Sequence, residues 1–297
     1  MLHALLALQQ LPRWGRQSLC DWYCRIRAHE LEIEEDVDAV HDLLQKTATP
    51  SLHLPSRADW RTAWATAAPA RYAELGIVVL GKWMDAYPTR MKESPVAPVL
   101  LFAKGNMSAL SAAEAVAIVG SRRCSAMGKV VAHRLGRFAA EEGMAVVSGL
   151  AVGADTAAHQ GCVAGGGHTV AVLAHALDQP IYPRANVRLA AEIVAKGGVL
   201  LSEYPLATPM HRGRFVARNR WQVMLSDAVV VVESDVDGGA MHTAGFARAQ
   251  NKPLGCVWLD SQSWQEIGRT KGNRKMLDEG AVPIRSRADL RTLRGRD

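Results

Sequence analysis

Long apolar runs are missing from this chain of 297 residues. No uninterrupted apolar stretch reaches the roughly 18 residues that a membrane helix needs, so we expect no membrane span. The first residues, MLHALLALQQLPRWGR, have neither the basic start nor the small-residue cleavage site of a secretory signal. We therefore expect a cytoplasmic protein that does not act on membranes.

Cysteine is scarce, and the motifs of common cofactor sites are absent. The five cysteines are scattered and form no paired CxxC motif, and the ten histidines include no HEXXH motif. This argues against a disulfide framework and a metal site. No strand is followed by GxGxxG, and no P-loop motif occurs, which argues against a dinucleotide or a P-loop nucleotide. We expect free thiols, no metal and no cofactor.

Positive charge is concentrated in two places rather than spread over the chain, whose net charge is +6. Residues 211–220, HRGRFVARNR, contain four arginines and no acid, and residues 269–297 hold nine Lys/Arg against four Asp/Glu. Residues 30–38, ELEIEEDVD, are strongly acidic. Clustered basic charge indicates a polyanionic partner, although a solvated helix face or tail would look the same in sequence.

The apolar pattern divides the chain into four zones. Helical spacing predicts a small all-helical domain over 1–50, and the Pro-rich and Ala-rich range 51–70 is typical of a linker with one short helix. Residues 71–285 alternate short β-rich runs with helix-length segments, and 286–297 form a basic tail. The runs are continuously apolar, so we expect an α/β fold with a mostly parallel, doubly wound sheet. The strands are expected at 77–80, 99–102, 116–119, 145–148, 169–173, 199–201, 228–232 and 254–258, and helices at 128–143, 156–165 and 241–251.

Glycine-containing turns follow three of these strands. In a parallel sheet such turns meet at one edge, where helix N-termini and glycine allow a phosphate to approach the backbone. Arg122 follows a strand-end Gly-Ser, where its guanidinium suits bidentate phosphate contact. Ser125 is expected to cap a helix, and Asp155 to complement a helix dipole. The candidate phosphate-binding residues of these turns are Gly120, Ser121, Arg122, Arg123, Ser148, Gly149, Gly153, Gly238, Gly239 and Thr243.

Two glutamates are the best candidates for catalysis. Glu203 and Glu233 each stand at a strand end and would form an acid and base pair if their strands were neighbours. The alternative is that each accepts hydrogen bonds from loop amides or meets an arginine. We favour this alternative and expect no catalytic residue.

Seven ordered motifs resemble the DNA-processing protein A (DprA/Smf) family. The similarity covers about residues 70–282, and the motifs are AIVGSRRCSAMG, VVSGLAVGADTAAHQG, TVAVLAHALDQPIYPRAN, GGVLLSEYP, GRFVARNRWQVMLSDAVVVVES, GGAMHTAGFA and GNRKMLDEGA. The resemblance implies an extended Rossmann-like core without turnover that binds single-stranded DNA, forms homodimers and helps load a RecA-type recombinase in natural transformation or repair.

The resemblance also assigns residues to the DNA pocket. It implies that Arg122 and the Phe-x-x-Arg-Asn-Arg segment, Phe215, Arg218, Asn219 and Arg220, line the pocket. Gly149, Gly153, Gly239 and Thr243 would complete it. Arg214 lies within the same basic segment, and Phe215 is expected either to stack on a base or to belong to the core.

The chain departs from the family pattern at three places. The family's Ser-Gly-Ser-Leu-Ile-Thr-Ala is replaced by residues 238–244, GGAMHTA, which lack both serines, and its Gly-Ile-Asp is replaced by 153–155, GAD. Residues 5–19, LLALQQLPRWGRQSL, resemble the family's N-terminal helix-hairpin-helix (SAM-like) domain, but Arg13 stands where the hairpin has its first glycine. Packing is therefore the expected role of that hairpin.

Two other functions remain open from the sequence. A Rossmann-like pocket could sense or hydrolyse a small nucleotide, including in phage defence, because glycine loops would serve it equally well. Residues 244–248, AGFAR, however, lack the glutamate that hydrolases of that type place there. A purely structural or scaffolding protein would leave the arginines solvated.

Overall fold

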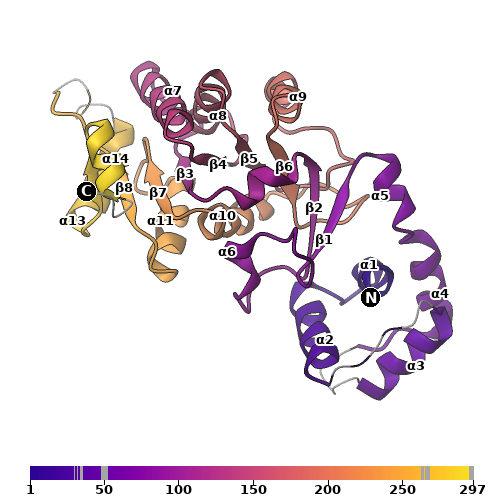
Figure 1. The fold of residues 1–297 in the computed structure, drawn as a ribbon. Helices are drawn as coiled ribbons and strands as arrows, with labels where there is room; N and C mark the ends of the chain where they lie inside the picture. The colour runs from indigo at the N-terminus through magenta and orange to yellow at the C-terminus, as the bar shows by residue number, and fades with distance from the viewer. Residues whose placement is uncertain are drawn as a thin grey trace.

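The computed structural model describes residues 1–29, 31, 33, 36–47, 53–261, 264 and 268–293. A helical unit stands at one end of a large α/β body (Figure 1). Much of the acidic segment 30–38 and the last residues of the basic tail, 294–297, lie outside the described residues.

The α/β body is built on one mixed sheet, which has nine strands within the described residues. Their spatial order is β1-β2-β6-β5-β4-β3-β7-β8-β9. All neighbours from β6 to β9 pair in parallel, while β1 and β2 add an antiparallel edge. The bounds are β1 Val78–Gly81, β2 Leu100–Gly105, β3 Ala115–Val119, β4 Ala145–Ser148, β5 Thr169–Val172, β6 Val199–Ser202, β7 Ala228–Val231, β8 Leu254–Val257 and β9 Val282–Ile284.

The strand order reverses at β3. The chain winds from β3 through β4 and β5 to β6 in one direction, then crosses to β7 on the other side of β3 and continues to β8 and β9. Val116 pairs with Val146 on one side and with Ala228 on the other. Open α/β sheets bind ligands beside the carboxyl ends of the strands at such a reversal.

Helices cover both faces of the sheet, as its continuously apolar strands require. One face packs Val116 and Ile118 of β3 against α7, α8 and α14, with α9 further along the same layer (Figure 1). The other face packs Ala117 and Val119 against α10, α11 and α13. The bounds are α7 Ala126–Glu141, α8 Ala154–Ala164, α9 Val187–Ala195, α10 Arg214–Met224, α11 Gly239–Ala249, α13 Lys271–Asp278 and α14 Arg287–Leu293.

The helical unit is larger than the expected range 1–50. The range that we expected to be a linker with one short helix contains α4. Trp60 and Ala63 of α4 belong to the core of the helical unit, where α4 packs against α1. The core also takes in Leu100 and Phe102 of β2, so the unit is attached to the sheet edge by a shared apolar interior. Arg13, between α1 and α2, has a positive φ of 67°, the conformation that a glycine would adopt more easily. The bounds are α1 Leu2–Gln10, α2 Arg16–Ala28, α3 Val37–Thr47, α4 Arg57–Thr66, α5 Ala70–Glu74 and α6 Thr89–Lys92.

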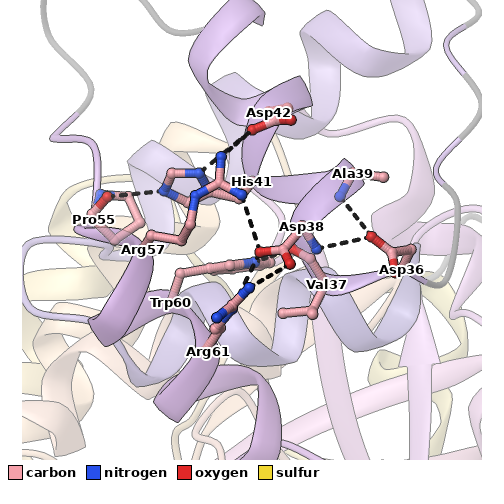
Figure 2. A network of polar contacts seen from close by, with 10 residues as sticks. All are labelled: Asp36, Val37, Asp38, Ala39, His41, Asp42, Pro55, Arg57, Trp60 and Arg61. Carbon is pink, nitrogen blue, oxygen red and sulfur yellow. Dashed lines mark hydrogen bonds and ion pairs between the residues drawn. The ribbon is translucent and has the colours of Figure 1, made fainter.

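Polar contacts join α3 to α4, as Figure 2 shows. Asp38 accepts hydrogen bonds from Arg57 (3.1 Å) and Arg61 (2.5 Å), and the indole Nε1 of Trp60 donates to the carbonyl oxygen of Val37 at 2.6 Å. The ion pairs are solvent-exposed, where such pairs contribute little to stability. The buried indole of Trp60 is therefore the main link between the two helices.

The C-terminal region also differs from the expected tail. Arg287–Leu293 form α14, which buries Leu290 and Leu293 against the sheet. A further strand, β9, was not expected from the sequence; it is a three-residue edge strand that contains Pro283. Edge strands tolerate proline because one row of their backbone groups needs no partner.

The predicted fold class is confirmed: the body is α/β with a mostly parallel, doubly wound sheet, and the N-terminal region is helical. All eight predicted strands are present within one or two residues of their expected positions, except that β2 runs three residues further. Among the described residues, no helix is long and apolar enough to cross a membrane, and no group of three or more His, Cys, Asp or Glu is placed to hold a metal ion.

Candidate nucleic-acid interface

A crevice of about 490 Å³ opens beside the carboxyl ends of β3 and β7, where the strand order reverses. Three of the predicted glycine turns contribute to its walls or support them. Its lining contains Val119, Gly120, Ser121, Arg122, Arg123, Ala151, Asp155, Phe215, Val216, Arg218, Asn219, Gln222, Ser234, Asp235, Asp237, Gly238, Gly239, Ala240, Thr243 and Arg269.

The turn after β3 supplies one wall of the crevice. The backbone N–H of Ser121 donates to the carbonyl oxygen of Glu233 (2.7 Å), and its hydroxyl accepts from the N–H of Arg123 (3.1 Å). These bonds hold the turn against the end of β7, and they leave Arg122 and Arg123 exposed. Both side chains are therefore accessible to a ligand, and phosphate binding by them stays a prediction.

The carboxylate of Glu233 is part of the framework of this wall. It is fully buried, accepts the N–H of Ser125 at 2.8 Å and accepts the hydroxyl hydrogen of the same residue. Ser125 also caps α7 by accepting from the N–H of Gly128 at 2.9 Å, which confirms its predicted role. Glu233 thus takes the structural role that we favoured over acid and base chemistry.

The turn after β4 supplies the floor. Gly149 lies directly beneath the guanidinium of Arg218, and Gly153 has a φ of 91° and packs on the backbone of Ser121. Ser148 was predicted to bind phosphate, but it is fully buried and its hydroxyl donates to the carbonyl oxygen of Ile118 at 2.7 Å. It lies within the sheet and has no access to a ligand.

Arg218 is the buried cation of the crevice. Only 3% of its surface is exposed, one guanidinium nitrogen donates to the carbonyl oxygen of Val172, and Nε finds no acceptor among the described residues. In the amide orientation that satisfies both groups, Gln222 accepts from Arg218 at 3.1 Å and from Gly149 N at 2.9 Å. Burial lowers the pKa of Arg218 to about 10, partly opposed by Asp155, so it stays charged at neutral pH.

Asp155 stands on the first turn of α8, where the sequence predicted an acid that complements the helix dipole. It accepts from the N–H groups of Gly149 (3.1 Å) and Ala151 (3.4 Å). Burial raises its pKa, against the opposing effect of Arg218. The buried carboxylate of Asp155 therefore faces two cations, the buried Arg218 and the exposed Arg122. Because two positive charges oppose one negative charge, the centre of the crevice favours an anion.

Phe215 forms an aromatic step at the rim. Its ring lies 4.9 Å from the guanidinium carbon of Arg122 and 5.4 Å from the ring of Tyr182. The side chain is half-buried and lines the crevice. Part of the side chain is thus open to a ligand, and Phe215 belongs to none of the apolar clusters of the described residues, so the core alternative has no support and stacking on a base stays a prediction.

The direction of α10 separates its arginines. Arg218 and Asn219 line the crevice, whereas Arg214 lies over the ring of Tyr204 (4.5 Å) and Arg220 lies near Trp221 (5.5 Å) and away from the crevice. Arg220 follows Arg218 by two residues and so differs from it by about 200° in direction, whereas Arg214 shares the side of Arg218 but lies one turn earlier, at the start of α10. The prediction that Arg214 and Arg220 line the site therefore has no support from the geometry.

The turn after β7 supplies the opposite wall. Gly238 and Gly239 begin α11, and Thr243 lines the crevice one turn later. Sequence reasoning missed the acids Asp235 and Asp237 and the cation Arg269, whose guanidinium donates to the carbonyl oxygen of Arg123. These acids lie near the glycine turn, so the positive end of the crevice is the side of Arg122 and Arg218.

Glu203 lies far from Glu233 in the strand order. It follows β6, which is separated from β7 by β5, β4 and β3, and it accepts from the indole Nε1 of Trp221 at 2.8 Å. The acid and base pair considered from sequence therefore does not form. His159 is fully buried, and burial lowers its pKa to about 3, so it is neutral at physiological pH.

Comparison with known proteins identifies the family. Residues 78–293 match the family model described as DNA recombination-mediator protein A. The chain is 37% identical over 224 residues to the DNA processing protein DprA of Bacillus subtilis, covering 74% of this chain and 72% of that protein. It is 35% identical over 209 residues to the DprA of Streptococcus pneumoniae, covering 69% and 70%.

Solved structures agree with this result. The X-ray structure of DprA from Streptococcus pneumoniae aligns with 97% of this chain and 95% of its own, with 28% identity and a TM-score of 0.78. A DNA processing protein A from Helicobacter pylori, whose structure concerns its single-stranded DNA binding mode, aligns with 72% and 93%, with 29% identity and a TM-score of 0.62. The chain belongs to the DNA recombination-mediator protein A family.

Proposed function

We propose that this protein binds single-stranded DNA in the crevice and does so without catalysis. The observation that supports this most strongly is the pairing of a buried cation, Arg218, with an exposed one, Arg122, that lies over the ring of Phe215. Arginines neutralise backbone phosphates regardless of sequence, and an aromatic face stacks on any base. The relative from Helicobacter pylori has a structure that concerns single-stranded DNA binding, which supports the same ligand here.

The groups of the crevice favour binding over turnover. The carboxylate of Glu233 is occupied by Ser125, and that of Asp155 accepts two backbone N–H groups and faces Arg218. A hydrolase would need a carboxylate or imidazole free to activate water. The remaining candidates are Asp235, which is half-buried, and Asp237, which is exposed. Incubation of a nucleotide mixture with the protein, followed by mass spectrometry, tests them directly; we expect no product.

The binding site is tested by fluorescence anisotropy with a labelled oligothymidylate. We expect Arg122→Ala combined with Arg218→Ala to abolish measurable binding, and Phe215→Ala to lose about 1–3 kcal/mol of binding free energy for each stacked base. Arg25→Ala combined with Arg27→Ala removes the same charge from exposed positions on α2 and serves as the matched control. Unchanged affinity in the first variant would overturn the site, and affinity that ignores salt would overturn phosphate recognition.

Family membership supports a wider role. We place the protein in DNA recombination and natural transformation, as a homodimer that helps load a RecA-type recombinase on single-stranded DNA. Light scattering at micromolar concentration should give twice the 32.2 kDa mass of the chain. Recombinase loading should be accelerated by the wild-type protein and not by the Arg122→Ala, Arg218→Ala variant; equal acceleration by both would contradict the proposed role of DNA binding in loading.

A further inference from the structure

A second hollow of about 590 Å³ lies on the outer surface between α7 and α8, which we name the α7–α8 groove. It shares no lining residue with the crevice and contains three basic side chains. Its lining consists of Lys129, Val130, His133, Arg134, Val152, Gly153, Thr156, Ala157, Gln160, Ala185 and Asn186.

The α7–α8 groove is positively charged. Lys129 and Arg134 are exposed on α7, and neither joins an ion pair within the described ranges. None of the described residues that line the groove is acidic. Glu141, at the far end of α7, is engaged by Arg137 (2.9 Å) and Arg287 (3.4 Å). An uncompensated basic groove favours an anionic ligand.

The groove and the crevice are joined by a small hollow of the same surface. This hollow is lined by Arg122, Gly149, Ala151, Val152, Tyr182, Pro183 and Phe215. It shares Arg122 and Phe215 with the crevice and Val152 with the α7–α8 groove. The three hollows therefore form one track from the turn after β7 to the middle of α7.

Apolar surface alternates with the cations along this track. Val130, Val152 and Tyr182 are all exposed, by 46%, 38% and 42%. Tyr182 continues the aromatic step begun by Phe215, since the two rings are 5.4 Å apart. Single-stranded nucleic acid combines charged phosphates with apolar base faces, and proteins bind it with basic grooves interleaved with such surfaces.

We infer that a single strand of nucleic acid continues from the crevice over Phe215 and Tyr182 into the α7–α8 groove, where Lys129, His133 and Arg134 bind its phosphates. The inference rests on the proposed function and adds a second contact region to it. A strand long enough to reach the groove is held at both regions, whereas a short one is held only in the crevice. Affinity therefore depends on length.

The test is a titration of Lys129→Ala combined with Arg134→Ala against labelled oligothymidylates of increasing length. Both positions are exposed, so folding is preserved. We expect unchanged affinity for the shortest oligonucleotide that binds and about ten-fold weaker binding of long ones, with the salt slope reduced by about 1.4 for two lost phosphate contacts. Arg25→Ala combined with Arg27→Ala should change neither quantity.

A second variant introduces repulsion without removing a cation. Val130→Glu places a carboxylate in the groove, and Val96→Glu places one at an equally exposed position in the loop before β2. We expect only Val130→Glu to weaken the binding of long oligonucleotides. Full affinity at every length in both groove variants would overturn the inference while leaving the crevice intact, whereas a wild-type protein that binds no single strand would overturn the proposed function itself.

Discussion

The guanidinium of Arg218 lies so close to Gly149 that a β-carbon at this glycine would overlap it. Gly149 is therefore required by the packing of a charge rather than by its own backbone angles. The arginine is held between this glycine, the carbonyl oxygen of Val172 and the amide of Gln222. A buried cation that is fixed in this way presents its charge to a ligand without a further entropic cost of ordering.

Gly149→Ala should displace Arg218. We expect a loss of about 1–3 kcal/mol in the free energy of unfolding, as for other overpacked sites, together with weaker binding of single-stranded DNA. Gly245→Ala is the control, because a β-carbon there would meet no described atom within 4 Å and the residue is exposed in α11. The control should gain about 0.5–1 kcal/mol. Urea titration measures both, and equal effects would contradict the overlap.

Arg122, which lines the crevice, should contribute more to DNA binding than Arg220, which lies on α10 away from the crevice. Arg122→Gln should weaken oligothymidylate binding at least about ten-fold, the cost of one charge-assisted phosphate contact. Arg220→Gln should change it less than about two-fold, because this side chain lies near Phe246 and Trp221. Both variants lose one charge, so anisotropy compares position alone. A larger loss of oligothymidylate affinity in Arg220→Gln would show that Arg220 contributes to the binding site.

Ser125 should matter more to stability than other caps. Ser125→Ala removes the cap of α7 and a donor to the buried Glu233, and we expect a cost of about 2–4 kcal/mol, combining the loss of a cap with that of a buried polar contact. Ser56→Ala removes the cap of α4, which is solvent-exposed, and should cost about 1 kcal/mol. Thermal unfolding of the two variants should rank them in this order; a reversed order would refute the role assigned to Glu233.

His159 should make the protein sensitive to acid. The folded protein keeps the ring neutral with a pKa of about 3, whereas the unfolded chain protonates it near 6.5. The unfolded state therefore binds more protons between these values, and stability falls as pH drops from 6.5 towards 3, by at most about 1.4 kcal/mol per pH unit from this group.

Urea titrations of the wild type and His159→Leu between pH 6.5 and 4.5 measure this contribution. The variant should be less stable at neutral pH, because Leu150 N loses its acceptor (3.3 Å), but its stability should depend less on pH. Carboxylates and His175 are common to both proteins and cancel in the comparison. Equal slopes would contradict a neutral, buried His159.

The sequence predicted the sheet well because β3 and β7 are buried on both faces, and this leaves uninterrupted apolar runs. It expected one short helix within 51–70 but did not assign α4 to the helical domain, although Trp60 and Ala63 have helical spacing, because proline and alanine around them were taken as signs of a linker. The sequence placed both Arg218 and Arg220 in the pocket, but only Arg218 lines it, because residues two apart on a helix point in directions about 200° apart. The place of Arg269 could not be predicted, since it depends on how the chain returns after β8.

The pairing of β3 with β7 also determines when the crevice forms. Val116 and its partner Ala228 are far apart in the chain, and the wall made by residues 234–239 follows β7 directly. A ribosome delivers Arg122 well before any of these residues, and contacts of long sequence separation form late. The first half of the sheet can therefore assemble on a nascent chain that has no crevice, and the crevice is completed only after the second half has been synthesised.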